Sequence, residues 1–239
     1  MPKEKHKKRP AEVQIPQRVA SIYARLKNRY SAGFEPIEVR GVTFNILAPQ
    51  DLEPFVAGKD IFKEASEFPF WVKIWEASVI LAHFMASLPP VPGQKILELG
   101  AGLGVTGLVA SHFGHNVLLT DYEDEVMDFP RISAAVNDCK TCSFDTLDWL
   151  DPKDLGKFDV IIGSEILFHQ KFFDPLLSIF DKYLKPEGII YMAHDSRRQS
   201  LGAFLPLCEK NFSVGVKKID MKSNDENFSI ILTRLARKG

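Results

Sequence analysis

The sequence predicts an α/β protein with a Rossmann-like, doubly wound sheet that is mostly parallel. Short apolar segments rich in Ile, Val and Leu are typical of buried parallel strands, and they lie at residues 95–99, 116–120, 158–163 and 187–193. Helical patterns separate them, at residues 103–113, 124–137 and 171–184. Because strand and helix alternate along the chain, successive strands are expected to lie parallel in one sheet.

The C-terminal part of the chain is predicted to close one edge of this sheet. Residues 212–219 and 227–235 alternate apolar and polar side chains, which is the pattern of half-buried strands. The turn-forming residues Ser223, Asn224 and Asp225 lie between these two segments. We therefore expect an antiparallel C-terminal hairpin.

Residues 13–68 are predicted to form an N-terminal extension made of a helix and a β-hairpin. Apolar side chains three or four residues apart indicate a helix within residues 13–30. Two short strands, residues 37–40 and 42–48, are expected to turn at Gly41.

The main domain is expected to span residues 69–239, with a further helical stripe at residues 76–88. Residues 1–12 are expected to form a disordered basic head. The formal net charge of the chain is −1, without the basic excess of a typical nucleic-acid binder. Nucleic-acid binding is therefore not expected of the domain, whereas the head leaves a contact with RNA or an acidic partner open.

The composition also bears on where the protein works. Hydrophobic residues make up 45% of the chain and charged residues 26%, which is ordinary for a soluble protein. The 3 cysteines do not suggest an extracellular disulfide framework, so a reducing, cytoplasmic location is expected. No apolar run approaches the roughly 18–20 residues that span a membrane.

A glycine-rich loop is the strongest local signal in the sequence. The strand that ends near Leu99 runs into Gly100, Ala101, Gly102 and Gly104, and a helix follows. Glycines in such a loop let the backbone approach a ligand closely, and the start of the helix offers free N–H groups. The loop is therefore predicted to bind a ligand at the carboxyl end of its strand.

Two ligand classes compete for this loop. Gly102, Gly104 and Gly107 match the G-x-G-x-x-G pattern of dinucleotide-binding proteins, which is weak evidence alone. Glu98 lies two residues before the first glycine, where its carboxylate is expected to face the ligand and repel a pyrophosphate. A sulfonium and an amine suit that carboxylate better, which favours S-adenosylmethionine.

Asp121 and its neighbour Tyr122 are candidates for a second part of the same site. Asp121 ends the next predicted strand, and a carboxylate there can accept hydrogen bonds from both ribose hydroxyls. The alternative role for Asp121 is to cap the helix that follows, whose first turn is acidic.

Five segments together support a narrower assignment: residues 72–78, 97–104, 120–121, 147–149 and 158–168. They contain a Trp at a helix start, the glycine loop, Asp121, a Leu-Asp-Trp sequence, and the predicted strand at residues 158–163 with the residues that follow it. In these segments the chain resembles the class I, or seven-β-strand, S-adenosylmethionine-dependent methyltransferases. More narrowly, it resembles the protein-lysine methyltransferase family 16, of the methyltransferase-like 21 type.

The resemblance implies a role for each matching residue. Trp75 would wall the methionine end of the cofactor, and the first two glycines of the loop would line its amino-acid portion. Trp149 would contact the adenine, with Asp148 near the exocyclic amine. Ser164 would lie under the cofactor near the catalytic mouth. The product would be S-adenosylhomocysteine, the substrate a protein lysine, and no metal is implied.

One departure from the family pattern concerns the acceptor. The family usually carries Asp-x-x-Tyr after the fourth strand, and this chain has Glu165-Ile-Leu-Phe168. The acid is retained with one more methylene, and the phenol hydroxyl is lost. Glu165 is our candidate for binding an incoming amine, and Phe168 is our candidate for the aromatic wall beside it. The alternative is that Glu165 caps the following loop.

Other functions stay open at this stage. Methyl transfer to a small molecule or an RNA base is one alternative, although the Asn-Pro-Pro-Tyr type of motif is absent. A cofactor-binding partner module without catalysis is another. Arg197 and Arg198 follow the predicted strand at residues 187–193 and are expected either to contact substrate or to pair with nearby acids.

Overall fold

The computed structural model of the protein describes residues 13–52, 69–223 and 226–238. The predicted head at residues 1–12 and residues 53–68 of the predicted extension lie outside these ranges. Within them no helix is long and apolar enough to cross a membrane.

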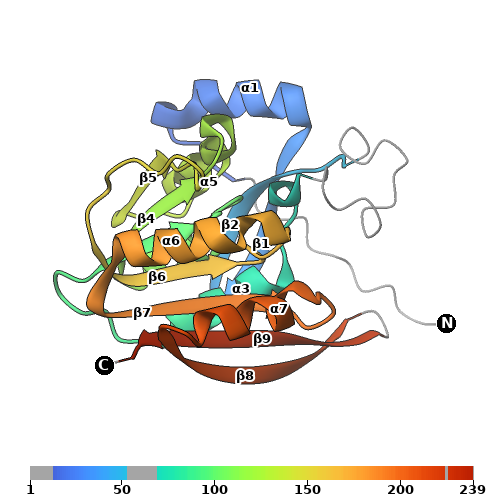
Figure 1. Ribbon diagram of the computed structural model, residues 1–239. Coiled ribbons are helices and arrows are strands. Elements are labelled where there is room, and N and C mark those ends of the chain that lie inside the picture. The colour runs from blue at the N-terminus through green and yellow to red at the C-terminus, as the bar shows by residue number, and fades with distance from the viewer. Residues whose placement is uncertain (1–12, 53–68, 224–225, 239) are drawn as a thin grey trace.

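The predicted fold class is confirmed by a seven-stranded sheet, which Figure 1 shows. Its strands are β3 (Lys95–Leu99), β4 (Asn116–Asp121), β5 (Cys142–Thr146), β6 (Phe158–Ser164), β7 (Leu184–Asp195), β8 (Phe212–Ser223) and β9 (Glu226–Arg237). They are ordered β5-β4-β3-β6-β7-β9-β8. The first five strands in this order run parallel to one another, through four pairings. β9 lies antiparallel between β7 and β8, and β8 and β9 form the predicted hairpin.

The order of the strands fixes where a ligand can bind. From β3 the chain moves outward through β4 to β5 and then returns to place β6 on the other side of β3. The helices that follow β3 and β6 therefore lie on opposite faces, and a crevice opens at the carboxyl ends of these two strands.

Helices cover both faces of the sheet, as Figure 1 shows. They are α3 (Glu76–Met85), α4 (Val105–His112) and α5 (Asp124–Val136) on one face, and α6 (Phe173–Tyr183) and α7 (Ser200–Cys208) on the other. Alternate strand residues enter two separate cores because successive side chains point to opposite faces. In β3, for example, Ile96 packs toward α3–α5, whereas Leu97 and Leu99 pack toward α6 and α7.

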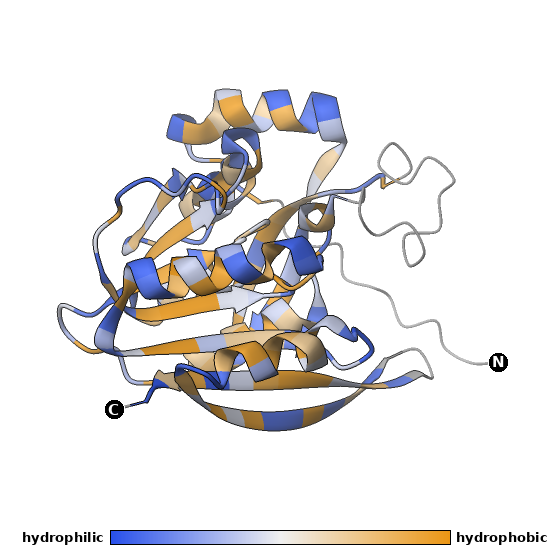
Figure 2. Cartoon of the chain, viewed as in Figure 1, coloured by the Kyte–Doolittle hydropathy of each residue, from blue (hydrophilic) through white to orange (hydrophobic). Residues whose placement is uncertain are grey.

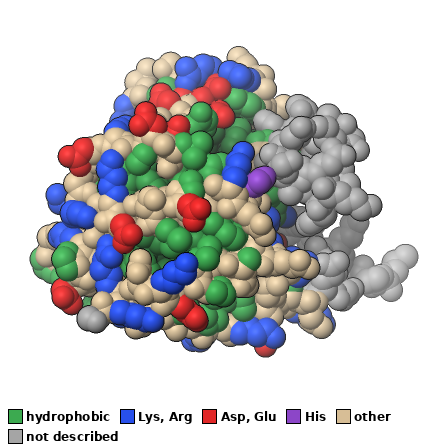
Figure 3. All heavy atoms as spheres, in the orientation of Figure 1, with side chains coloured by type: hydrophobic (Ala, Val, Ile, Leu, Met, Phe, Trp, Pro, Cys, Tyr) green, Lys and Arg blue, Asp and Glu red, His purple; other side chains and the backbone are tan. Residues whose placement is uncertain are grey.

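The apolar stripes of these helices face inward (Figure 2). Charged side chains of both signs are interspersed over the face seen in Figure 3, in keeping with the near-zero net charge.

The N-terminal segment adds a helix and a hairpin, as predicted. A short 3₁₀ turn, η1 (Gln17–Val19), leads into α1 (Ala20–Tyr30), and β1 (Ala32–Val39) pairs antiparallel with β2 (Val42–Pro49). β1 begins five residues earlier than predicted, because Pro36 interrupts the strand pattern without breaking the pairing.

Hydrogen bonds attach this segment to α5. The Leu47 N–H donates to Ser133 Oγ at 2.9 Å, and the Asn137 side chain exchanges two bonds with the Asn45 backbone, at 2.9 and 2.8 Å. From α1, Arg25 pairs with the buried carboxylate of Asp128. The segment is thus fastened to the helix that follows β4.

Two elements were missed from the sequence. β5 is an edge strand with the sequence Cys-Ser-Phe-Asp-Thr and has no fully buried residue, so it lacks the apolar run of its neighbours. α7 contains Gly202 and Pro206, which weaken a helical pattern. Its Leu201 and Phe204 are nevertheless buried in the core, so tertiary packing stabilises the helix.

Candidate active site

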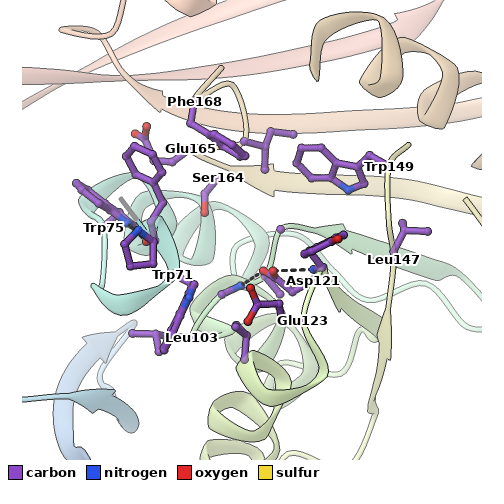
Figure 4. A pocket seen from close by; sticks show the side chains of 18 of the residues that line it. Trp71, Trp75, Leu103, Asp121, Glu123, Leu147, Trp149, Ser164, Glu165 and Phe168 are labelled. Atoms are coloured by element: carbon purple, nitrogen blue, oxygen red, sulfur yellow. Dashed lines mark hydrogen bonds between the residues drawn. The ribbon is translucent and has the colours of Figure 1, made fainter. Parts of the chain in front are cut away.

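A cavity of about 470 Å³ opens at the carboxyl ends of β3, β4 and β6, beside the reversal of strand order. Ligand sites of this fold class occur at that place, and the volume suits a molecule of cofactor size. All of the predicted site residues except Glu98 and Gly104 line it: Trp75, Gly100, Ala101, Gly102, Asp121, Tyr122, Asp148, Trp149, Ser164, Glu165 and Phe168. Figure 4 shows several of them converging from different elements.

The glycine loop takes a conformation that requires glycine. Gly100, Gly102 and Gly104 have φ of 59°, 51° and 77°, in the left-handed region. Gly104 is turned inward, where an added Cβ would lie 2.5 Å from Pro130 Cβ, so this glycine serves helix packing and not the cavity. The Trp71 backbone closes over Gly102, with its Cα 3.4 Å from an added Cβ.

The Glu98 side chain does not face the ligand as the sequence suggested. Side chains alternate along β3, so Glu98 shares the face of Ile96 and points beneath the loop toward α4. It is 2% exposed, and its Oε2 accepts the Gly107 N–H at 3.0 Å. An added Cβ on Gly107 would lie 2.3 Å from that oxygen, so the third glycine of the pattern makes room for a carboxylate.

Burial raises the pKa of Glu98 to about 8, and the Gly107 hydrogen bond opposes the shift only in part. Between about 4.5 and 8 the unfolded chain is ionised at this group while the folded chain keeps the proton. The contribution of Glu98 to the free energy of unfolding is therefore full below pH 4.5 and is lost as pH rises through about 8. Between these values the free energy of unfolding falls by about 1.4 kcal/mol per pH unit.

We expect Glu98→Gln to remove this loss, because the amide oxygen can still accept the Gly107 N–H but does not titrate. The window from pH 7 to 8 isolates Glu98, since Glu165, with a pKa of about 7, and His194, whose pKa falls to about 3, act mainly below it. Urea unfolding should show the wild type losing roughly 1 kcal/mol across the window and the variant almost nothing. Equal losses would mean that Glu98 is ionised in the folded protein.

Asp121 is held at the end of β4 by the glycine loop. Its Oδ2 accepts the Gly102 N–H at 2.8 Å and its Oδ1 accepts the Tyr122 N–H at 2.7 Å, both drawn in Figure 4. Burial raises its pKa, while these two amides favour the charged form. Because a carboxylate has about four acceptor positions, both oxygens can still accept from a diol in the cavity.

Trp149 walls one side of the cavity beyond Asp121. Its ring lies against the loop, with Cζ2 3.6 Å from an added Cβ on Gly100. Asp148 accepts the Leu150 N–H at 2.8 Å, which fixes the turn that presents the indole. Tyr122 lines the same end and is 66% exposed, so this side offers flat apolar surface to a ligand.

Aromatic rings surround the opposite end, near Trp75. Phe70 stacks on Phe168 with ring centroids 5.5 Å apart, and lies 5.9 Å from the Trp75 ring. Phe168 also lies 5.1 Å from Phe172 and 6.2 Å from Trp149, so it connects the two ends. The Trp75 indole is fixed by its Nε1–H, which donates to the Phe70 carbonyl at 2.6 Å.

Glu165 follows β6 and turns sharply into this end of the cavity. Its φ of 54° is unusual for a residue with a long side chain, and such backbone conformations concentrate at functional sites. Oε1 accepts the Asp195 N–H at 2.7 Å, and Oε2 lies 2.6 Å from Arg198 Nε. Burial raises the pKa of Glu165 to about 7, against the lowering effect of the Arg198 charge.

Several lining residues were not proposed as site residues from the sequence. Phe70 and Trp71 lie on the short 3₁₀ turn η2 (Phe70–Val72), and Lys73 follows it, just before Trp75. Phe172 lies on a second such turn, η3 (Gln170–Phe172). Trp71 also contacts the Tyr30 and Phe129 rings while lining the cavity. The aromatic residues that come shortly before Trp75 in the sequence were the signal that could have indicated these further lining residues.

The cavity residues fit S-adenosylmethionine. The Asp121 carboxylate suits a ribose, the Trp149 ring suits an adenine, and aromatic rings such as Trp75 suit a sulfonium cation. Across the described ranges no cluster of three or more His, Cys, Asp or Glu side chains is placed to hold a metal ion.

The sheet order and this cavity define a class I S-adenosylmethionine-dependent methyltransferase. Residues 60–211 match the family model described as lysine methyltransferase, and the chain belongs to that family. Its cofactor is S-adenosylmethionine.

Known proteins agree with this assignment. The chain is 28% identical to protein N-lysine methyltransferase METTL21A of Danio rerio over 151 residues, which cover 59% of this chain and 68% of the relative. It is 29% identical to histone-arginine methyltransferase METTL23 of Mus musculus over 112 residues, 44% of each chain. In fold it is similar to precorrin-6y C5,15-methyltransferase from Geobacter metallireducens, with a TM-score of 0.56, 13% identity, and coverage of 71% of this chain and 92% of that structure.

Proposed function

We propose that this methyltransferase methylates a lysine side-chain amine of a protein. The observation that carries the proposal is the end of the cavity beyond Ser164, where a carboxylate, Glu165, lies among the aromatic rings of Phe70, Trp75 and Phe168. Aromatic faces attract an alkyl cation, and a carboxylate orients an amine. The N-lysine methyltransferases among its relatives support the same substrate class.

The cofactor is proposed to lie along the cavity between Trp149 and Trp75. Asp121 would hold its ribose, the loop from Gly100 to Gly102 its amino-acid portion, and Trp149 its adenine. Bound there, it supplies a methyl group already activated on a sulfonium. The chain is left with positioning the acceptor and excluding water.

The acceptor must be a neutral amine when it attacks the methyl group. With an ordinary pKa near ~10.4, a lysine side chain needs about 4–5 kcal/mol to lose its proton at neutral pH. Desolvation by the surrounding rings disfavours the ammonium form. We propose that Glu165 accepts a hydrogen bond from the amine, with Phe168 shaping the opening.

A cytoplasmic location belongs to the same proposal. The described cysteines, Cys139, Cys142 and Cys208, are all free thiols, which suits a reducing compartment.

The acceptor class is tested by methyl transfer from labelled S-adenosylmethionine into a cell lysate. We expect the label in material that protease digests and RNase leaves intact. An RNase-sensitive, protease-resistant label would instead favour RNA, and label confined to small molecules would remove the protein substrate altogether. The Asp121→Ala variant serves as the blank, because it should bind little cofactor.

A further inference from the structure

A cation of the protein itself lies against three residues that line the acceptor end of the cavity. The Arg198 guanidinium carbon lies 4.9 Å from the centroid of the Phe70 ring and 5.2 Å from that of Trp75. Its Nε lies 2.6 Å from Glu165 Oε2. One guanidinium therefore contacts two aromatic rings and a buried carboxylate. We call the three residues that provide them, Phe70, Trp75 and Glu165, the cation cage.

The cage has the chemistry of a receptor for an alkyl cation. Ring faces attract cations through their quadrupoles, and a carboxylate with little access to water attracts them by charge. The Glu165 side chain is only 4% exposed, so its charge is poorly screened by solvent. All three cage residues also line the cofactor cavity.

Arg198 is placed so that it can leave the cage. It lies in the turn between β7 and α7, and its backbone N–H closes that turn by donating to the Asp195 carbonyl at 3.0 Å. The side chain is 24% exposed, so it reaches the cage from the solvent side. Swinging the side chain outward breaks no helix or strand hydrogen bond.

The neighbouring arginine behaves differently. Arg197 donates to the Asp195 carboxylate at 2.6 Å and stacks on Phe228, 4.8 Å from the ring centroid. Neither Phe228 nor Asp195 lines the cavity. Of these two arginines, only Arg198 contacts the cage and could compete with a ligand for it.

We propose that Arg198 is an internal stand-in for the acceptor, and that a cationic side chain enters the site by displacing it from the cage of Phe70, Trp75 and Glu165. The inference rests on the proposed function, because it places the acceptor at the same end of the cavity. It adds that the acceptor binds as a cation before its proton is lost. It also makes Arg198 a determinant of acceptor affinity.

Binding of small cations tests this directly. Ethylguanidinium, n-butylammonium and uncharged 1-butanol are titrated into the full chain saturated with S-adenosylhomocysteine, and tryptophan fluorescence or calorimetry reports binding. We expect Arg198→Ala to bind both cations at least about 10-fold more tightly than the wild type, because the competitor is gone. Arg197→Ala, the matched control, should bind them as the wild type does.

Further variants keep the test decisive. Arg198→Gln is made beside Arg198→Ala, so that a folding defect in one leaves the other. Adding Glu165→Gln to either should abolish the gain, and 1-butanol should show none. Unchanged cation affinity in both folded Arg198 variants, or an equal gain for 1-butanol, would overturn the proposal.

Failure here is distinguishable from failure of the proposed function. If the Arg198 variants bind S-adenosylhomocysteine and label lysate proteins but gain no cation affinity, only the displacement is wrong. If the wild type labels no protein at all, the proposed acceptor is wrong independently of Arg198.

Discussion

Asp121→Ala is expected to lose at least about 100-fold in affinity for S-adenosylhomocysteine, since two charge-assisted hydrogen bonds at about 1.5–3 kcal/mol each would disappear. The Asp121 oxygens point into the cavity from the end of β4 and also hold the Gly102 amide. The substitution therefore removes the proposed ribose contact and loosens the loop that should cradle the amino-acid portion.

Isothermal titration calorimetry on the folded variant measures this loss, with Asp124→Ala as the matched control. Asp124 is an exposed acid at the start of α5 that pairs with Arg131 and lies outside the cavity lining. The control should bind as the wild type does, and neither protein should bind NAD. An Asp121→Ala affinity within a few-fold of the wild type would show that the ribose is held elsewhere.

Glu165→Gln is expected to have the second large effect, a fall of about 10- to 100-fold in methyl transfer with cofactor affinity nearly unchanged. The carboxylate lies beyond Ser164, at the aromatic end of the cavity, away from Asp121 and Trp149 (Figure 4). An amide at this position keeps the size of the side chain but loses the charge that would orient an amine and hold Arg198.

The labelled-lysate rate and the affinity for S-adenosylhomocysteine are measured together for this variant. Glu165→Asp is the conservative control, because it retains the charge and Asp tolerates the φ of 54° at this position. It should keep more activity than Glu165→Gln. If Glu165→Gln instead weakens cofactor binding as much as Asp121→Ala does, Glu165 belongs to the cofactor subsite and the proposed division of roles is wrong.

The parts of the site that follow from local sequence were predictable. The loop from Gly100 to Gly104 lies directly between a strand and a helix, so its positive φ values follow from its glycines. Asp121 and Ser164 end strands whose apolar runs are plain in the sequence. Parallel strands bring their carboxyl ends to one edge, so these residues had to meet there.

Other features of the site and the fold did not follow from the sequence patterns used for prediction. Glu98 was expected in the cavity because it lies near the strand end, but the alternation of side chains along β3 turns it toward α4 and Gly107. The edge strand β5 and the helix α7 carry weak patterns and form because neighbouring elements pack on them.

Long-range contacts were the least predictable part. The sequence left Arg198 undecided between substrate and a nearby acid, and only the fold brings it against Phe70, Trp75 and Glu165. These residues come from separate segments, and no spacing in the sequence relates them.

Identifying the methylated residue tests the central proposal most directly. Lysate proteins labelled by the wild type are hydrolysed to amino acids, and the labelled products are separated, with Asp121→Ala as the blank. The proposed function predicts label in N-methylated lysine that the blank lacks. Label confined to another amino acid, such as arginine or histidine, would contradict the proposed lysine acceptor.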